Sequence, residues 1–401
     1  MKIRPLAALA SLALALTCLA ATGPQADAAP APNANSHAQK LCDPAKAKAD
    51  EATCFAQRLV DGSDRAVDPM VTTSGAMIPA DIRSAYHLTG TASGGRTVAI
   101  VDAFGYPNAE RDLAVYRSTY GLSACTSSNG CLTIVNQAGS TNKKRLPRYE
   151  FGWASEQALD LAAVSATCPD CKILLVQANT ASLTDLGAAV NTAAKWPGVV
   201  AISNSYGAGD LADSTYGSYF NHPGIAVTAS TGDSGSVGAS FPASSRYVTA
   251  VGGTSLYQAT GTTRGWTETV WSGAGSGCSA VNAAPTGQTQ SMTDCAKRAT
   301  ADVAAVADPN TGLRIYAPAS GGGSGWQQYG GTSLSAPIIA AVYALSGNTA
   351  GYANGIPYTR QGSLFDVTSG SNGSCGTKVC NARAGWDGPT GLGTPNGVGG
   401  F

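Results

Sequence analysis

The sequence of 401 residues predicts an α/β fold in which helices cover both faces of a parallel β-sheet within one large domain. Three observations lead to this prediction: short apolar runs, helix-compatible segments between them, and 49 glycines spread without a three-residue period. A chain of this length can hold two or three domains, although large α/β enzymes often use it for one. No internal repeat divides the sequence.

Four of the apolar runs predict strands, because they are short and rich in β-branched residues. They lie at residues 97–101, 172–176, 199–203 and 225–229. Apolar residues on both faces are typical of a parallel sheet that is covered on both sides. Residues 152–167 and 182–195 suit helices long enough for the crossover between parallel strands. Residues 266–330, rich in small and hydroxyl residues, predict loops and short strands rather than a separate domain.

The N-terminus has the pattern of a secretory signal peptide over residues 1–28. Lys2 and Arg4 precede an apolar run at residues 6–21, and Ala-Asp-Ala at residues 26–28 offers a cleavage site. A membrane anchor is the alternative, but the run is shorter than the roughly 20 residues that span a bilayer. We therefore expect a secreted, extracellular protein with a short linker or pro segment at residues 29–75 and a catalytic domain at residues 76–401.

Charge and cysteine content agree with an exported globular protein. The 25 basic and 25 acidic residues cancel, which argues against nucleic-acid or membrane partners because both require a basic surplus. We expect a monomer. Without Cys18 in the signal, ten cysteines remain, and we predict disulfides between sequence neighbours. The predicted pairs are Cys42 with Cys54, Cys125 with Cys131, Cys168 with Cys171, Cys278 with Cys295, and Cys375 with Cys380. For Cys168 and Cys171, half a zinc site or a redox motif is the alternative.

A candidate nucleophile lies in residues 331–337, GTSLSAP, which precede an apolar run at residues 338–345. The glycines allow a sharp turn and the run suits a buried helix, so Ser333 would lie at a helix N-terminus. Backbone N–H groups there stabilise negative charge on an attacked carbonyl. The alternative is that Ser333 merely caps the helix. The three histidines, His37, His87 and His222, lie in no glycine-flanked motif, which disfavours a Ser-His-Asp triad.

Two acidic motifs offer other chemistry. Glu156 and Asp160 are four residues apart on a predicted helix whose neighbours are apolar and which has no Lys or Arg. A partly buried pair that shares a proton can act as a general base, whereas a solvated acidic stripe is the alternative. Asp233 lies in STGDSG, residues 230–235, directly after a predicted strand, where α/β proteins build their sites. The same loop is also ordinary turn chemistry.

In this order, the segments resemble the sedolisin family, the serine-carboxyl peptidases with a subtilisin-like fold. The resemblance covers residues 78–401 and includes residues 241–254, FPASSRYVTAVGGT. It implies that Ser333 is the nucleophile, Glu156 the general base and acid, and Asp160 its orienting partner. Asp233 would donate a hydrogen bond to the oxyanion, which a carboxyl does only while protonated, so we expect activity in acid.

The resemblance also implies a substrate strand and a calcium site. Ser205, Tyr206 and Gly207 would pair with an extended peptide, and Asp102 would support Asp160. Calcium would be bound by these oxygen ligands: the side chains of Asp366 and Asp387 and the carbonyls of Val367, Arg383 and Gly385. Arg383 departs from the glycine usual in the family. The segment before the catalytic domain is also shorter than the family's folded propeptide.

The leading hypothesis is therefore a secreted, acid-acting, calcium-stabilised endopeptidase that acts on protein or peptide substrates. A second hypothesis is a non-catalytic secreted binding or scaffold protein of the same fold. A histidine-dependent subtilisin-type protease is a third, but it would need one of the poorly placed histidines.

Overall fold

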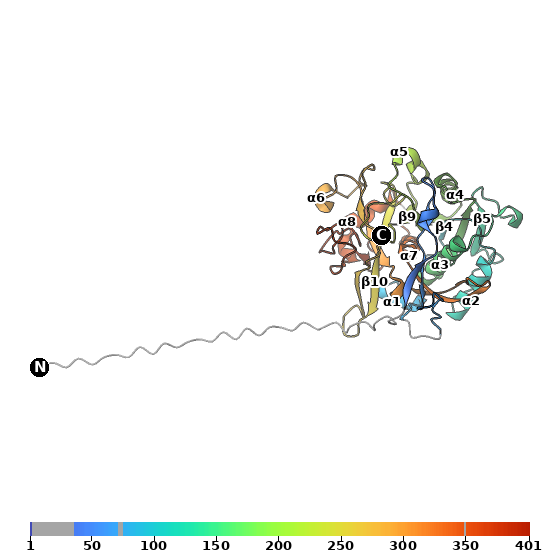
Figure 1. Cartoon of the computed structure of the whole chain (residues 1–401), viewed down its shortest axis with the longest axis horizontal. Coiled ribbons are helices and arrows are strands. Elements are labelled where there is room, and N and C mark those ends of the chain that lie inside the picture. Colours follow the sequence, from blue (N-terminus) through green and yellow to red (C-terminus); the bar gives the residue numbers. More distant parts are fainter. Residues whose placement is uncertain (2–35, 71–74, 349) are drawn as a thin grey trace.

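The computed structural model describes residues 1, 36–70, 75–348 and 350–401. Its centre is an eight-stranded sheet in the order β11-β10-β9-β7-β4-β6-β5, with β14 also paired to β10 (Figure 1). Every pair in this sheet is parallel except β10 with β11. The predicted α/β fold with a parallel sheet is thus confirmed.

The elements have the following bounds. The helices are α1 (Pro79–Ala85), α2 (Ala109–Thr119), α3 (Phe151–Thr167), α4 (Leu183–Lys195), α5 (Asp213–Tyr216), α6 (Gln290–Thr293), α7 (Thr332–Ser346) and α8 (Ile356–Thr359). The strands of the large sheet are β4 (Thr97–Ala103), β5 (Leu132–Asn136), β6 (Lys172–Ala178), β7 (Val199–Asn204), β9 (Ala226–Ser230), β10 (Thr249–Gln258), β11 (Trp266–Val270) and β14 (Val303–Val306). The other strands are β1 (His37–Lys40), β2 (Thr53–Cys54), β3 (Gln57–Val60), β8 (Tyr206–Gly207), β12 (Gly277–Cys278), β13 (Ala299–Thr300), β15 (Leu313–Pro318), β16 (Ser324–Gly330), β17 (Leu364–Phe365) and β18 (Thr394–Pro395).

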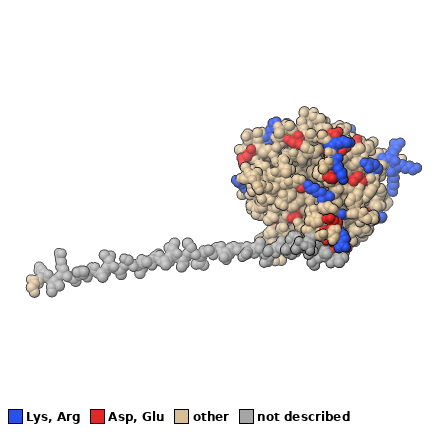
Figure 2. All heavy atoms as spheres, viewed as in Figure 1, with Lys and Arg blue, Asp and Glu red and all other residues tan. Residues whose placement is uncertain are grey.

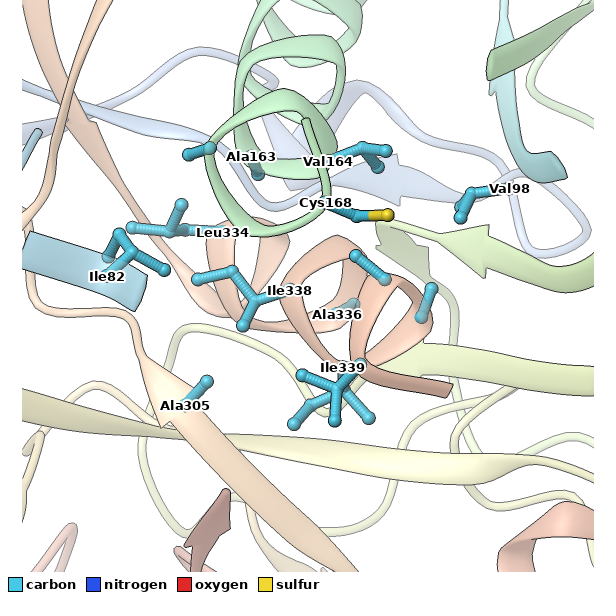
Figure 3. Packing of buried hydrophobic residues seen from close by; sticks show 14 of the residues in the cluster. Ile82, Val98, Ala163, Val164, Cys168, Ala305, Leu334, Ala336, Ile338 and Ile339 are labelled. Atoms are coloured by element: carbon cyan, nitrogen blue, oxygen red, sulfur yellow. The ribbon is translucent and has the colours of Figure 1, made fainter. Parts of the chain in front are cut away.

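The central strand β4 is buried on both faces, as its continuous apolar sequence predicts. Val98 and Ile100 pack in the hydrophobic cluster that includes α3 and α7, whereas Ala99 and Val101 pack in the cluster that includes α4. Figure 3 shows α3 and α7 meeting through apolar side chains of the first cluster. Strand β4 is therefore packed between α3 and α7 on one face of the sheet and α4 on the other.

The predicted strands and helices agree with the structure to within a few residues, and all five predicted disulfides are present. The bonds join Cys42 to Cys54, Cys125 to Cys131, Cys168 to Cys171, Cys278 to Cys295, and Cys375 to Cys380. The disulfide leaves no free thiolate at the third pair to bind zinc, and the burial of Cys168 and Cys171 argues against the redox alternative.

Part of the segment predicted as a linker forms strands. β1 and β3 pair with each other, and β3 joins the hairpin of β15 and β16, which gives a second sheet in the order β1-β3-β16-β15. The pairing between β3 and β16 is antiparallel and places Tyr329 opposite Arg58. The predicted signal peptide and Cys18 lie outside the described residues. The boundary at residues 75 and 76 stays a prediction, with strands of the N-terminal segment packed onto the domain that follows.

The surface is sparsely charged. On the face drawn in Figure 2, Lys, Arg, Asp and Glu side chains are dispersed among other residues, as 12% charged residues would give. Among the helices of residues 36–70, 75–348 and 350–401, none has both the length and the apolar character needed to cross a membrane.

Candidate active site

Helix α3 carries the two acidic residues of the predicted pair into the interior. The helix begins after Glu150, whose carboxylate accepts a hydrogen bond from the Trp153 N–H at 2.8 Å. Glu156 and Asp160 lie one turn apart on the same face, and both are fully buried. The alternative of a solvated acidic stripe is therefore wrong.

The carboxyl group of Glu156 has one hydrogen bond of ordinary geometry. Its Oε2 accepts a hydrogen bond from the Ala56 N–H at 2.7 Å, whereas no described group meets hydrogen-bond geometry with Oε1. Burial raises the pKa of Glu156 well above its ordinary value, and repulsion from Asp102 raises it further. The Ser333 hydroxyl and the Ala56 N–H lower this pKa because they stabilise the charged form.

Two more carboxyls stand beside Glu156. Asp160 Oδ1 accepts a hydrogen bond from the Ser205 hydroxyl at 2.9 Å, and Asp102 lies near the end of β4 with neither oxygen hydrogen-bonded to a described group. Burial raises the pKa of Asp160 and of Asp102 well above ordinary values, and for Asp160 repulsion from Asp102 and Glu156 adds to it. Within the described residues no ion pair neutralises these three carboxyls. Carboxyls that repel one another in this way can share protons.

Ser333 is the second residue of α7 and does not cap it. The cap is Gly331, whose φ of 99° is a conformation that favours glycine, and a Cβ there would lie 2.1 Å from the Phe55 carbonyl oxygen. The Ser333 hydroxyl donates a hydrogen bond to the Ser205 carbonyl at 3.2 Å. The alternative role of Ser333 as an N-cap is thus wrong.

Pro337 explains why the carbonyl of Ser333 needs another partner. Proline has no N–H, so the helical hydrogen bond to the residue four positions earlier is missing. The Ser205 hydroxyl lies 3.3 Å from this carbonyl and 2.9 Å from Asp160 Oδ1. A protonated Asp160 can donate to Ser205, which then donates to Ser333. Because Pro337 leaves the Ser333 carbonyl without its helical partner, the Ser205 hydroxyl can contact both this carbonyl and Asp160.

Asp233, in the loop after β9, is bound to the start of α7. Its Oδ1 accepts hydrogen bonds from the N–H and the hydroxyl of Thr332, each at 2.8 Å, and its Oδ2 accepts one from Gln57 Nε2 at 2.8 Å. Burial raises the pKa of Asp233 to about 7, although these hydrogen bonds oppose the rise. This carboxyl keeps its proton in acid and loses it near neutrality.

One residue of the predicted substrate strand, Gly207, lines an open cavity of about 500 Å³ together with Asp233. Ser205 precedes β8 and contacts both Asp160 and Ser333. Tyr206 is fully buried and donates a hydrogen bond from its hydroxyl to Asn204 Oδ1 at 2.8 Å, so its side chain belongs to the interior. Gly207 pairs with Thr53 of β2.

The three histidines lie elsewhere. His37 contacts Asp64 at 3.0 Å, His87 contacts Asn396 at 2.8 Å, and His222 Nε2 lies 2.9 Å from the Tyr219 carbonyl. None of these contacts involves Ser333, which argues against a histidine-dependent protease.

The predicted calcium ligands come together between β17 and β18. Asp366 Oδ2 accepts a hydrogen bond from the Gly385 N–H at 2.8 Å, and Asp387 Oδ2 accepts one from the Arg383 N–H at 3.2 Å. Burial raises the pKa of Asp387 to about 7, and repulsion from Asp366 adds to it. No group of three or more His, Cys, Asp or Glu in the described residues could hold a metal, so backbone carbonyls such as that of Val367 would have to complete the site. Carboxylate and carbonyl oxygens without a basic partner fit a hard cation.

Comparisons with known proteins find several similar peptidases. Kumamolisin from Bacillus sp. (strain MN-32) is 30% identical over 362 residues, which cover 80% of this chain and 62% of kumamolisin. Sedolisin from Pseudomonas sp. (strain 101) is 33% identical over 180 residues, which cover 40% of this chain and 30% of sedolisin. The solved structure of Pseudomonas sedolisin, a serine-carboxyl proteinase complexed with two molecules of pseudo-iodotyrostatin, superposes with a TM-score of 0.66 at 26% identity, covering 80% of this chain and 95% of that one. The chain is thus similar to sedolisin-family proteins over most of its length, and it spans less than two thirds of the length of the curated relatives it matches. No family model matches it.

Two residues of the site could not be predicted from the sequence. Ala56 and Gln57 lie in the N-terminal segment, yet they donate hydrogen bonds to Glu156 and Asp233. No local pattern marks them, because their positions follow from the pairing of β2 with β8 and of β3 with β16.

Proposed function

We propose that the chain is a secreted, acid-acting serine-carboxyl endopeptidase that cleaves protein or peptide substrates. The supporting observation is the cluster of buried carboxyls, Glu156, Asp160 and Asp102, beside the Ser333 hydroxyl. With three raised pKa values and no basic partner among the described residues, the cluster holds protons in acid and can lose one. A carboxylate formed there can accept the proton of Ser333 as an imidazole would.

In the proposed reaction, the Ser333 oxygen attacks the carbonyl carbon of the peptide bond and its proton moves to Glu156. Protonated Asp233 donates a hydrogen bond to the oxyanion. Glu156 then passes the proton to the leaving amine, and the acyl group stays on Ser333 as an ester. Water hydrolyses the ester with Glu156 as the base, which restores the hydroxyl. Asp160 orients Glu156, and the backbone from Ser205 to Gly207 binds the substrate as an extended strand.

Cleavage of denatured casein between pH 3 and pH 8 tests this function. We expect cleavage in acid that declines toward neutrality, because Asp233 loses its proton with a pKa of about 7. Product peptides are identified by mass spectrometry, so exopeptidase and endopeptidase action are distinguished. A neutral or alkaline optimum would favour a histidine enzyme. Absence of cleavage at every pH would favour the non-catalytic scaffold.

We also propose a structural calcium ion held by Asp366, Asp387 and the carbonyls of Val367, Arg383 and Gly385. The ion would neutralise two carboxylates that repel each other between β17 and β18 and so stabilise the folded state. At 100 times its Kd, a ligand adds about 2.7 kcal/mol of stability, so in a domain of this size chelation should lower Tm by about 4 °C.

Differential scanning calorimetry with and without a chelator measures this effect at pH 6. The Asp387→Asn variant should melt lower than the wild type and should not respond to the chelator. In contrast, Asp294→Asn changes an exposed carboxylate and should respond as the wild type does. An unchanged wild-type melting curve after chelation would contradict the site.

A further inference from the structure

A cavity apart from the candidate active site lies against β5, the strand at one edge of the large sheet. Its volume is about 410 Å³, and residues 132–134 of β5 line it together with residues that follow β4. It shares no lining residue with the cavity of about 500 Å³ at Gly207 and Asp233. Sites for small molecules commonly have volumes of about 300 to 1,000 Å³, so this cavity is large enough for one.

One wall of this cavity is held in place by backbone contacts. The Gly105 N–H donates a hydrogen bond to the Arg148 carbonyl at 2.8 Å, and a Cβ at Gly105 would clash with the Pro147 carbonyl oxygen. At the end of β5, Asn136 Nδ2 donates a hydrogen bond to the Arg145 carbonyl at 2.9 Å. The segment that forms this wall is therefore fixed to the ends of β4 and β5, as in a preformed binding site.

Apolar groups line much of the interior of the cavity. Leu132, Ile134 and Leu146 contribute aliphatic side chains. Tyr106 contributes its ring, because its hydroxyl donates a hydrogen bond to Asp112 Oδ2 at 2.5 Å. These groups favour a ligand with an aromatic or aliphatic body.

The Gln177 side chain supplies a buried acceptor. Gln157 Nε2 donates to the carbonyls of Ala103 at 3.1 Å and Phe104 at 3.2 Å, and Gln177 Nε2 donates to Gln157 Oε1 at 2.8 Å. These contacts fix the orientation of both amides, because only the nitrogen of an amide can donate. Gln177 is 1% exposed and lines the cavity, and its Oε1 has no hydrogen-bond partner among the described residues. A ligand with a hydroxyl or N–H group would satisfy this acceptor.

The opening of the cavity is basic. Lys143 lines it, and four exposed basic side chains lie within six residues there: Lys143, Lys144, Arg145 and Arg148. None of the ion pairs between described residues includes them. Figure 2 shows basic side chains projecting from the side of the molecule that carries the β5 label in Figure 1. Glu110, which also lines the cavity, accepts hydrogen bonds from the N–H and the hydroxyl of Ser127. Four cations beside this one carboxylate favour an anionic group on the ligand.

We propose that this cavity is a binding site for a small aromatic acid that carries a hydrogen-bond donor. The donor meets Gln177 Oε1, the ring lies among the apolar side chains, and the carboxylate faces Lys143. A ligand without the donor leaves Oε1 unpaired, so the site discriminates against it. A ligand without the carboxylate forgoes the attraction of the basic opening.

Isothermal titration calorimetry of the full chain at pH 6.5 tests this site. The probes are 3-(4-hydroxyphenyl)propionate and 3-phenylpropionate, and every protein carries Ser333→Ala so that the readout does not depend on cleavage. We expect the hydroxylated probe to bind about tenfold more tightly, because it alone pairs with Gln177 Oε1. Gln177→Met should remove this preference. Ile134→Trp, which fills the cavity from a half-buried position, should abolish binding of both probes.

Two lysines give a matched pair of variants. Lys143→Ala should weaken binding of both probes about three- to fivefold, the effect of losing one exposed ion pair. Lys144→Ala removes a neighbouring exposed cation that does not line the cavity, so its affinity should equal that of the parent chain. Scanning calorimetry of the same samples shows that each variant is folded.

Three outcomes would overturn the inference. One is the absence of binding by either probe. The second is equal affinity of the parent chain for the two probes, because the acceptor would then play no part. The third is binding that folded Gln177→Met and Ile134→Trp leave unchanged, which would place the probe elsewhere. Casein cleavage tests the proposed function separately, so either proposal can fail while the other stands.

Discussion

Replacing Glu156 with Gln should lower kcat/KM for peptide cleavage about 100- to 10,000-fold, the range for loss of a general base. The amide oxygen of Gln can still accept the hydrogen bond from the Ala56 N–H, so the segment and the helix keep their contacts. Gln cannot accept the proton of Ser333, however, and the proton has no described histidine nearby as an alternative acceptor. The lower kcat/KM of this variant would therefore reflect loss of proton transfer and not loss of the folded state.

Kinetics with a casein-derived peptide at pH 4 and calorimetry of the same samples measure both effects. Tm of the Glu156→Gln variant should equal or exceed that of the wild type, because a buried carboxyl that repels Asp102 and Asp160 is removed. Glu110→Gln is the matched control, since Glu110 contacts Ser127 away from the cleft. Full activity of Glu156→Gln would show that this carboxyl is not the base.

Asp233 should set the upper limit of the active pH range. Its pKa of about 7, raised mainly by burial, means that the donor proton is present in acid and is lost as pH rises through 7. Above that pH, the rate of the wild type should fall about tenfold per pH unit, since each unit reduces the protonated fraction by that factor. Asp233→Asn keeps a donor at every pH, so its activity should extend above neutrality. Asp233→Ala should lose about 100- to 1,000-fold at pH 4.

The pH profiles of kcat/KM for these variants give the test, with Asp294→Asn as a control at an exposed carboxyl. The acidic limb should be common to all of them, because it reports the shared titration of Glu156, Asp160 and Asp102. If the pH profiles of the wild type and of Asp233→Asn were identical above pH 7, Asp233 would not be the group that sets this limit. The contribution of Asp233 to the free energy of unfolding should depend on pH in the same direction as activity. Because folding raises the pKa of this carboxyl, it stabilises the folded state most below about pH 4, and this contribution is lost as pH rises through 7.

Local chemistry explains what could be predicted. The strand at Thr97–Ala103 and the helix at Phe151–Thr167 follow from apolar runs, and the spacing of Glu156 and Asp160 places both on one helix face. The disulfides join sequence neighbours, so their pairing needed no knowledge of the fold. The proximity of Glu156 to Ser333 could not be predicted from local sequence, because it depends on the packing of α3 against α7. It was expected only from the family resemblance.

The strand pairing of the N-terminal segment could not be predicted from local sequence. β2 is two residues long and has no periodic pattern, and its partner β8 lies about 150 residues further along the chain. Pairings of this kind depend on which edges the folded domain leaves open. Short polar strands do not specify them locally. Ala56 and Gln57 were therefore predicted only as part of a linker.

Among the residues that the structure describes, every disulfide spans 17 residues or fewer, and Cys42–Cys54 lies wholly within the stretch before Phe55. No described disulfide therefore joins that stretch to the rest of the protein. Hydrolysis of one peptide bond after Cys54 would leave it attached only by noncovalent contacts, as a separate peptide with its own internal cross-link.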